Sequence, residues 1–333
     1  MTRGTRAVAL CVAIIVSVTG CGAAKGLLGI GEAPKENAAS VPLTVDQAQR
    51  ILTRDFTAAQ QGETTTGTTA QSALRTAYTG MGLRAANARI KLAKVQPAVG
   101  DSPVLSPQQP RLLALSRGLG FPRVIIAQTV TKEDPVPILH LLSSPNAATP
   151  YRISASATML AASSIKPFDP LTKGSPLVTD GTGLAVTDTA LLKAYAAGMA
   201  FPVKAVANPP FAADPFSKQV RAKAAATARA VSVQASFLQV HKVVPKSSYA
   251  IRQASGDALV FGVIERTDSF KVKSGQAVNT AGNKAFVLLS GKKRVTKAAS
   301  ITWLEFVVFS VPRSTGRATL VAAAEQVVAG SGS

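Results

Sequence analysis

The stretch Ile301-Thr-Trp-Leu-Glu-Phe-Val-Val-Phe309 decides which fold the sequence predicts. It is rich in β-branched and aromatic residues, which are enriched in β-strands. Because successive side chains of a strand point to opposite faces, Trp303, Glu305, Val307 and Phe309 share one face. The stretch therefore predicts a buried strand that carries one charged side chain on an apolar face.

Strand and helix patterns surround this stretch. Short runs between Pro, Asn and Gly residues predict strands at 123–130, 137–143, 151–160, 237–243, 249–253, 259–266, 301–311 and 317–327. Helical spacing of apolar residues predicts helices from Thr44 or Asp46 onward, over 72–94, over 188–199 and over 216–233. The second helix is expected to run into a strand at 90–95, and loops are expected at 60–69, 97–110 and 276–284.

The order of these elements predicts an α+β fold in two parts. Each half has two helices before a run of antiparallel strands, and helices segregated against an antiparallel sheet define this class. A segment rich in Pro, Gly, Asp and Thr at 166–183 is the expected linker. It would separate a first α+β unit at 41–165 from a second at 184–329.

The N-terminus predicts export. Arg3 and Arg6 precede an apolar run at 7–18, which is shorter than the ~20 residues that a membrane span needs. Small residues follow this run, as they do at the cleavage site of a signal peptide. Residues 1–20 are therefore the expected signal peptide.

The end of this segment, Val18-Thr-Gly-Cys21, resembles the lipobox of bacterial lipoproteins. The resemblance implies that Cys21 becomes the first mature residue and carries a diacylglycerol on its thiol. Two acyl chains would hold the protein at the outer face of the cytoplasmic membrane, with 21–40 as a tether. The alternative is an ordinary secretory signal that ends near a cysteine.

Charge and cysteine content limit the classes of partner and of chemistry. The net charge of +20 falls to +18 when Arg3 and Arg6 leave, and three stretches, 75–94, 218–252 and 271–297, hold cations without an acid. Such charge attracts anionic lipid or an anionic wall polymer. Nucleic acid is not an expected partner, because aromatic residues are only 5% and the chain is exported. Apart from Cys21 the mature chain has no cysteine, which excludes an internal disulfide and a thiol nucleophile.

Few residues are candidates for catalysis. Neither His140 nor His241 has a carboxylate or second His at metal-ligand spacing, so no metal and no cofactor are expected, and each is interpreted as a histidine with satisfied hydrogen bonds. Ser163-Ser-Ile-Lys166 matches the Ser-x-x-Lys pattern of penicillin-recognising enzymes. Pro167 disfavours the helix that this pattern needs, so the match is interpreted as chance.

Glu305 is the one unusual position. A carboxylate on an apolar face is costly unless it is paired or wet. Two hypotheses follow: the face of Trp303, Glu305, Val307 and Phe309 lines a ligand pocket, or Glu305 pairs with a cation such as Arg317 across the hairpin. The second is the preferred one.

The element order of each half resembles the cystatin-like, cone-shaped fold of the nuclear-transport-factor-2 superfamily, in which helices pack on a curved antiparallel sheet. Most of the chain also resembles a family of uncharacterised actinobacterial lipoproteins. The lipobox, Leu43-Thr-Val-Asp-Gln-Ala-Gln-Arg-Ile-Leu52 and Trp303-Leu-Glu-Phe306 carry that resemblance. It implies two tandem cone-shaped units on an anchored protein.

Together these observations predict a lipid-anchored, extracytoplasmic binding or interaction protein of the cell envelope without enzymatic activity. It would bind a protein partner, a small apolar ligand or an anionic polymer. One alternative is an enzyme that uses a pocket in one cone-shaped unit. Such pockets often hold an Asp/His dyad as acid and base, but neither half shows one on adjacent predicted strands. Another is a basic adaptor held on anionic lipid or wall polymer.

Overall fold

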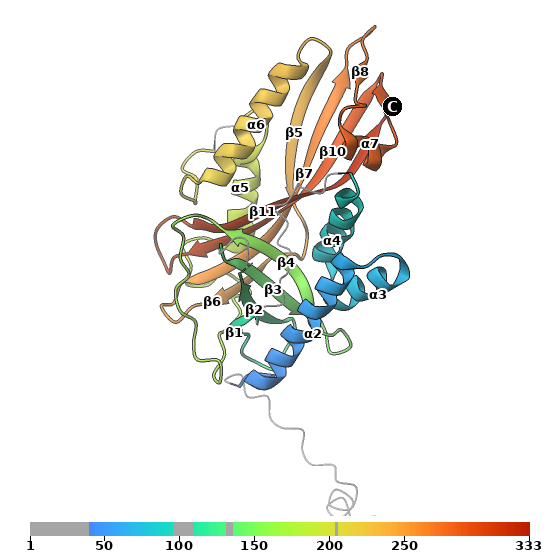
Figure 1. Ribbon diagram of the computed structural model, residues 1–333. Coiled ribbons are helices and arrows are strands. Elements are labelled where there is room, and N and C mark those ends of the chain that lie inside the picture. The colour runs from blue at the N-terminus through green and yellow to red at the C-terminus, as the bar shows by residue number, and fades with distance from the viewer. Residues whose placement is uncertain (1–39, 96–109, 131–135, 204–205) are drawn as a thin grey trace, which may run out of the picture. The chain divides into compact units, whose positions relative to one another are not determined.

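The computed structural model describes residues 40–95, 110–130, 136–203 and 206–333. The predicted signal peptide, Cys21, the tether up to residue 39 and most of the expected loop at 97–110 lie outside these residues. Within the described residues, six helices and a large antiparallel sheet form a mixed α+β fold (Figure 1). This confirms the predicted fold class at the level of its element types.

Helix α2 (Val45–Thr64) begins at one of the two predicted caps. The Thr44 hydroxyl accepts a hydrogen bond from the Gln47 backbone (3.2 Å), and the Gln47 side chain accepts one from the Thr44 backbone (2.8 Å), which makes a capping box. The loop expected at 60–69 is wrong for most of its length. The Thr64 hydroxyl donates to the Gln60 carbonyl, so the last turn continues before α3 (Gly67–Ala77) starts.

The helix expected over 72–94 is interrupted. Tyr78 adopts an extended backbone and forms a bridge with Ile153, and the Thr79 N–H donates to the Ile153 carbonyl (3.0 Å). This pairing ends α3 and lets α4 (Gly80–Ala93) begin in a new direction. The strand expected at 90–95 is also wrong, because α4 runs through Ala93 and buries Leu92.

Three helices follow in the second half. Helix α5 (Asp188–Met199) matches its prediction, and α6 (Pro215–Val231) is capped by the Asp214 carboxylate. Helix α7 (Lys284–Ser290) was not predicted, and Asn283 caps it. No helix among the described residues has both the length and the apolar character needed to cross a membrane.

Eight of the nine predicted strands form, and the main sheet adds one that was not predicted, β1. Its strands pair in the order β1-β2-β3-β4-β11-β10-β7-β5, and β6 pairs with β7 as well. Their bounds are β1 (Arg111–Leu115), β2 (Arg123–Thr129), β3 (Ile138–Ser144), β4 (Arg152–Met159), β5 (Ala235–Val243), β6 (Tyr249–Arg252), β7 (Ala258–Val272), β10 (Ala298–Val311) and β11 (Thr319–Gly332). A separate pair, β8 (Val278–Asn279) and β9 (Arg294–Val295), lies beside α7.

The segment predicted as a linker has a different role. The backbone of Ser175 exchanges hydrogen bonds with Leu115 and Arg117 at the end of β1 (2.8 Å each). Three residues on, Val178 donates to Ala250 of β6, and Arg252 of β6 donates to Pro176. Residues 175–178 thus join the first strand of the sheet to β6 and close a ring of strands.

The ring encloses one core that both predicted units share. Leu139 and Ala155 from the first half and Phe261 and Leu304 from the second belong to the same cluster of buried apolar residues. Residues 38–333 form a single compact unit. The expected separation at 166–183 is therefore corrected: this segment is part of the packed body.

Because the halves share a core, we predict that the described body unfolds in one cooperative step. Calorimetry should give one transition whose calorimetric and van't Hoff enthalpies agree. Limited proteolysis should not cut within 166–183 before global unfolding, since closing hydrogen bonds hold that backbone. Two resolved transitions, or an early cut there with two stable fragments, would contradict the shared core.

Candidate functional site

Polar side chains gather on one face of the long strands of the second half. His241, Arg266 and Trp303 lie opposite one another on β5, β7 and β10. The neighbouring rows bring Gln239 beside Asp268, and Glu305 beside Glu325. We call these residues the polar cluster: Gln239, His241, Arg266, Asp268, Trp303, Glu305 and Glu325.

Helices α5 and α6 cover this face. Leu192 and Tyr195 of α5 pack in one cluster with Ile264 and Val307 of the sheet. The helix comes close because residue 262 is a glycine, where a Cβ would lie 2.5 Å from the Leu192 side chain. The cluster therefore lies within the packed body.

Glu305 is the centre of the polar cluster. Its side chain is 0% exposed, and its two oxygens contact different partners. Arg266 Nη1 donates to Oε1 at 3.0 Å, and His241 Nδ1 lies 2.9 Å from Oε2. A buried carboxylate with two such partners is compensated by charge and by hydrogen bonds.

His241 is hydrogen-bonded through both ring nitrogens. Nε2 lies 3.1 Å from Gln239 Oε1, and Gln239 Nε2 donates to Asp268 Oδ1 at 2.8 Å. Since the Gln239 amide nitrogen is used on Asp268, both ring nitrogens of His241 face oxygen acceptors. Both ring nitrogens of His241 therefore have protein partners.

Arg266 links the cluster to solvent. The same Nη1 that bonds Glu305 also donates to Glu325 (2.8 Å), and Lys223 of α6 donates to Glu325 from an exposed position (3.0 Å). The guanidinium carbon lies 4.3 Å from the centre of the Trp303 ring, a cation–π contact. A third carboxylate, Asp268, also faces Arg266, with Oδ2 3.5 Å from Nε.

Burial and charge act in opposite directions on these groups. Burial raises the pKa of Asp268, and the nearby charge of Arg266 offsets this only in part. Burial also acts to raise the pKa of Glu325, but the charges of Arg266 and Lys223 outweigh it, so that pKa lies below its ordinary value. For Arg266 the surrounding carboxylates outweigh burial and raise its pKa.

These contacts decide between the two hypotheses for Glu305. It pairs with a cation as preferred, but the predicted partner is wrong: the cation is Arg266 on the adjacent strand, and Arg317 is not involved. Val307 and Phe309 are fully buried, and the Phe309 ring packs edge-on against Tyr195 of α5 at 4.9 Å. Side chains therefore occupy the space over this part of the predicted pocket face.

The His241–Glu305 contact was not predicted, because the two strands are separated by β7 in the sheet and the two residues by 64 positions in the chain. Only strand order and register bring them together. One signal was available: His241 and Gln239 alternate along one strand face, as Glu305 and Trp303 do on theirs.

The remaining sequence candidates have structural roles. His140 is fully buried, with Thr129 and Ser156 hydroxyls 2.8 Å from its two nitrogens, and burial lowers its pKa to about 3. This confirms it as a satisfied core histidine. The Ser163 hydroxyl donates to two backbone carbonyls, and Lys166 pairs with Asp257, so the Ser-x-x-Lys match has no catalytic geometry.

A second buried carboxyl lies in the first half. Asp55 is fully buried on α2, and Arg54 donates to one of its oxygens (2.7 Å) while the other has no hydrogen-bond partner. Burial raises the pKa of Asp55 to about 7, against the opposing effects of Arg54 and Arg152. No group of three or more His, Cys, Asp or Glu side chains in the described residues could hold a metal ion.

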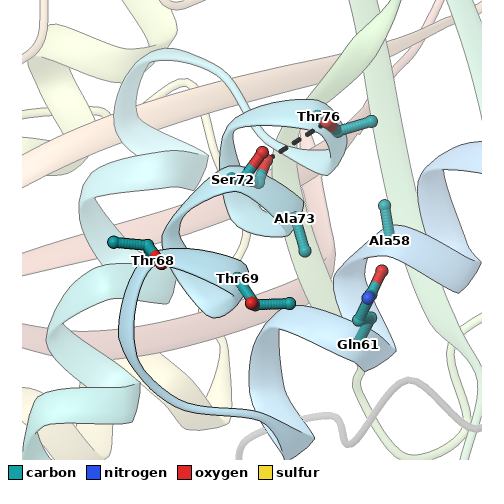
Figure 2. A pocket seen from close by; sticks show the side chains of 7 residues that line it. All are labelled: Ala58, Gln61, Thr68, Thr69, Ser72, Ala73 and Thr76. Carbon is teal, nitrogen blue, oxygen red and sulfur yellow. Dashed lines mark hydrogen bonds between the residues drawn. The ribbon is translucent and has the colours of Figure 1, made fainter.

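A shallow groove lies between α2 and α3. It has a volume of about 480 Å³ and is lined by alanines, hydroxyl side chains and one amide (Figure 2): Ala58, Gln61, Thr68, Thr69, Ser72, Ala73 and Thr76. None of these carries a charge or an aromatic ring. The groove has no group that could act as an acid, a base or a nucleophile activated by one.

The comparisons with known proteins add no constraint on this site. No family model matches the chain, and no curated protein and no solved structure is similar to it.

We predict that Glu305→Gln lowers the free energy of unfolding by about 3–5 kcal/mol, because it leaves Arg266 and His241 without their buried partner. Glu265→Gln is the matched control, since Glu265 pairs with Arg84 in a half-exposed bridge (2.6 Å) worth less than about 1 kcal/mol. Urea denaturation measures both. A neutral or stabilising Glu305→Gln substitution would instead indicate an unpaired carboxylate, as the pocket hypothesis requires.

Proposed function

We propose that the protein is a lipid-anchored, extracytoplasmic binding or interaction protein of the cell envelope without enzymatic activity. The anchor at Cys21 and the outer face of the cytoplasmic membrane are proposed from the sequence of residues 1–21. The proposed partners are an envelope protein, an anionic lipid or an anionic wall polymer. The protein would act by holding such a partner near the membrane.

The burial of His241 and Glu305 in the polar cluster is the observation that supports a function without catalysis. It contains the one His–carboxylate pair among the described residues, and such pairs are common acid/base machinery. Here the side chains of His241 and Glu305 are both 0% exposed, and both ring nitrogens have protein partners. A substrate would find no free nitrogen to exchange a proton with.

One observation favours the enzyme alternative. The His241–Glu305 distance of 2.9 Å is that of a functional dyad, and Arg266 beside it could stabilise negative charge. This reading requires α6 to move away from the sheet, because Lys223 of α6 bonds to Glu325 at the edge of the cluster. Accessibility of His241 in the folded protein separates the two functions.

We also propose a cone-shaped arrangement for the second half, as its resemblance implies. What supports it is the placement of α5 and α6 on one face of long antiparallel strands (Figure 1). The same proposal for the first half rests on α2, α3 and α4, which precede β1 to β4. Because both halves share one core, we propose the cone-shaped arrangement only for the order of elements in each half, and not as two separately folded units.

The anchor is tested with the two cysteines of the chain. We predict that Cys21→Ser prevents lipidation, whereas Cys11→Ser, within the apolar run, leaves it intact. Fractionation followed by intact-mass measurement should find diacylglycerol on membrane-bound wild type and on Cys11→Ser only. A membrane-bound wild type without diacylglycerol, or lipidated Cys21→Ser, would refute the anchor.

A further inference from the structure

The end of the sheet farthest from α2 carries an unusual concentration of positive charge. Seven cations occur between Asp268 and Glu305 with no acidic residue among them. All seven are exposed: Lys271, Lys273, Lys284, Lys292, Lys293, Arg294 and Lys297. We call residues 271–297 the basic tip.

The charges of the basic tip are uncompensated within the described chain. Some cations elsewhere pair with acids, as Lys166 does with Asp257 and Arg117 with Asp169. No ion pair joins any of the seven tip cations to a described acidic side chain. Like charges held close together repel one another, so an anionic partner would be bound favourably here.

The basic tip is an ordered platform. Phe286 of α7 and Val295 of β9 pack against Val272 in a small apolar core that is separate from the main one. Strands β8 and β9 pair through Val278 and Val295, and the Thr280 backbone donates to the Lys293 carbonyl (2.9 Å). The cations are thus presented from an ordered backbone, which loses little freedom when they bind.

The apolar residues of α7 favour one kind of partner. Val287, Leu288 and Leu289 are half-buried, and Lys284 precedes them while the Lys292-Lys293-Arg294 run follows. Aliphatic side chains flanked by cations suit the headgroup region of a bilayer, where charge contacts phosphate and the aliphatic groups reach the acyl boundary. A soluble polyanion would use the cations and gain nothing from the aliphatic groups.

We propose that the basic tip is a docking surface for an anionic phospholipid bilayer. The tip and the start of α2 lie at opposite ends of the described body (Figure 1), so a surface that contacts the tip need not contact α2. Docking at the basic tip would specify the partner in the proposed function, and it depends on that function only for the location in the cell envelope. Docking through the tip does not require lipid on Cys21.

Vesicle binding tests the inference with two variants of equal net charge. The protein is the chain from Gly22, which holds every described residue and lacks the proposed lipid. The tip variant changes Lys292, Lys293, Arg294 and Lys297 to Gln. The control variant changes four exposed cations outside the tip, Arg50, Arg75, Lys91 and Lys94, to Gln.

The wild type and the control variant should bind phosphatidylcholine–phosphatidylglycerol vesicles and not pure phosphatidylcholine vesicles. The tip variant should lose roughly fivefold in affinity for each of the four cations removed, and so about six hundredfold in all. Unchanged urea midpoints would show that both variants fold. In the wild-type background, Leu288→Gln should weaken binding to the anionic vesicles without changing binding to soluble polyphosphate.

Three results would overturn the proposal. Equal losses in the tip and control variants would mean that overall charge governs binding. Absence of wild-type binding to the anionic vesicles at low salt would exclude the surface. Wild-type binding to polyphosphate as tight as to vesicles, with no effect of Leu288→Gln on either, would assign the basic tip to a soluble polyanion. None of these outcomes depends on whether Cys21 is lipidated, so the proposed lipid anchor and the proposed docking surface are tested independently.

Discussion

The ion pair between Arg266 and Glu305 is the contact on which the second half of the structure depends. Removing such charges from water costs several kcal/mol each, and only well-placed partners recover that cost. Here the partners come from four strands, β5, β7, β10 and β11, so the pair can be satisfied in one register only. A slip of β10 by one residue would move Glu305 to the opposite face of the sheet and leave Arg266 without this buried partner. We infer that the polar cluster specifies strand register and that apolar burial supplies the stability.

The closure of the sheet explains why the two halves behave as one body. Residues 175–178 bond to β1 on one side and to β6 on the other, and the enclosed core draws on both halves. Beyond this ring, β5, β7, β10 and β11 continue outward and carry the polar cluster, with α7 and the basic tip past it. The charge at the tip is thus supported by the same strands that hold Arg266 and Glu305.

Local sequence signals predicted much of this fold, whereas contacts between distant segments of the chain could not be predicted. The Thr44 cap, α5 and eight of the nine expected strands follow from periodicity and from Pro, Gly and Asn breaks, which act within a few residues. The pairing of Tyr78 with Ile153 and the closing role of Ser175 depend on chain segments far away in sequence, so a helix and a linker were predicted instead. For the site, the strand face of Glu305 was predictable, whereas Arg266 and His241 as its partners require the strand order.

Reagent access to the two histidines tests the central claim, that the polar cluster is closed and structural. Diethyl pyrocarbonate modifies imidazole nitrogens that solvent can reach, and His140 and His241 are the chain's only histidines. Both have two hydrogen-bonded ring nitrogens, so peptide mass mapping should find neither modified in the folded protein and both modified after unfolding in urea. Rapid modification of His241 while His140 stays protected would contradict the claim and favour an open, catalytic dyad.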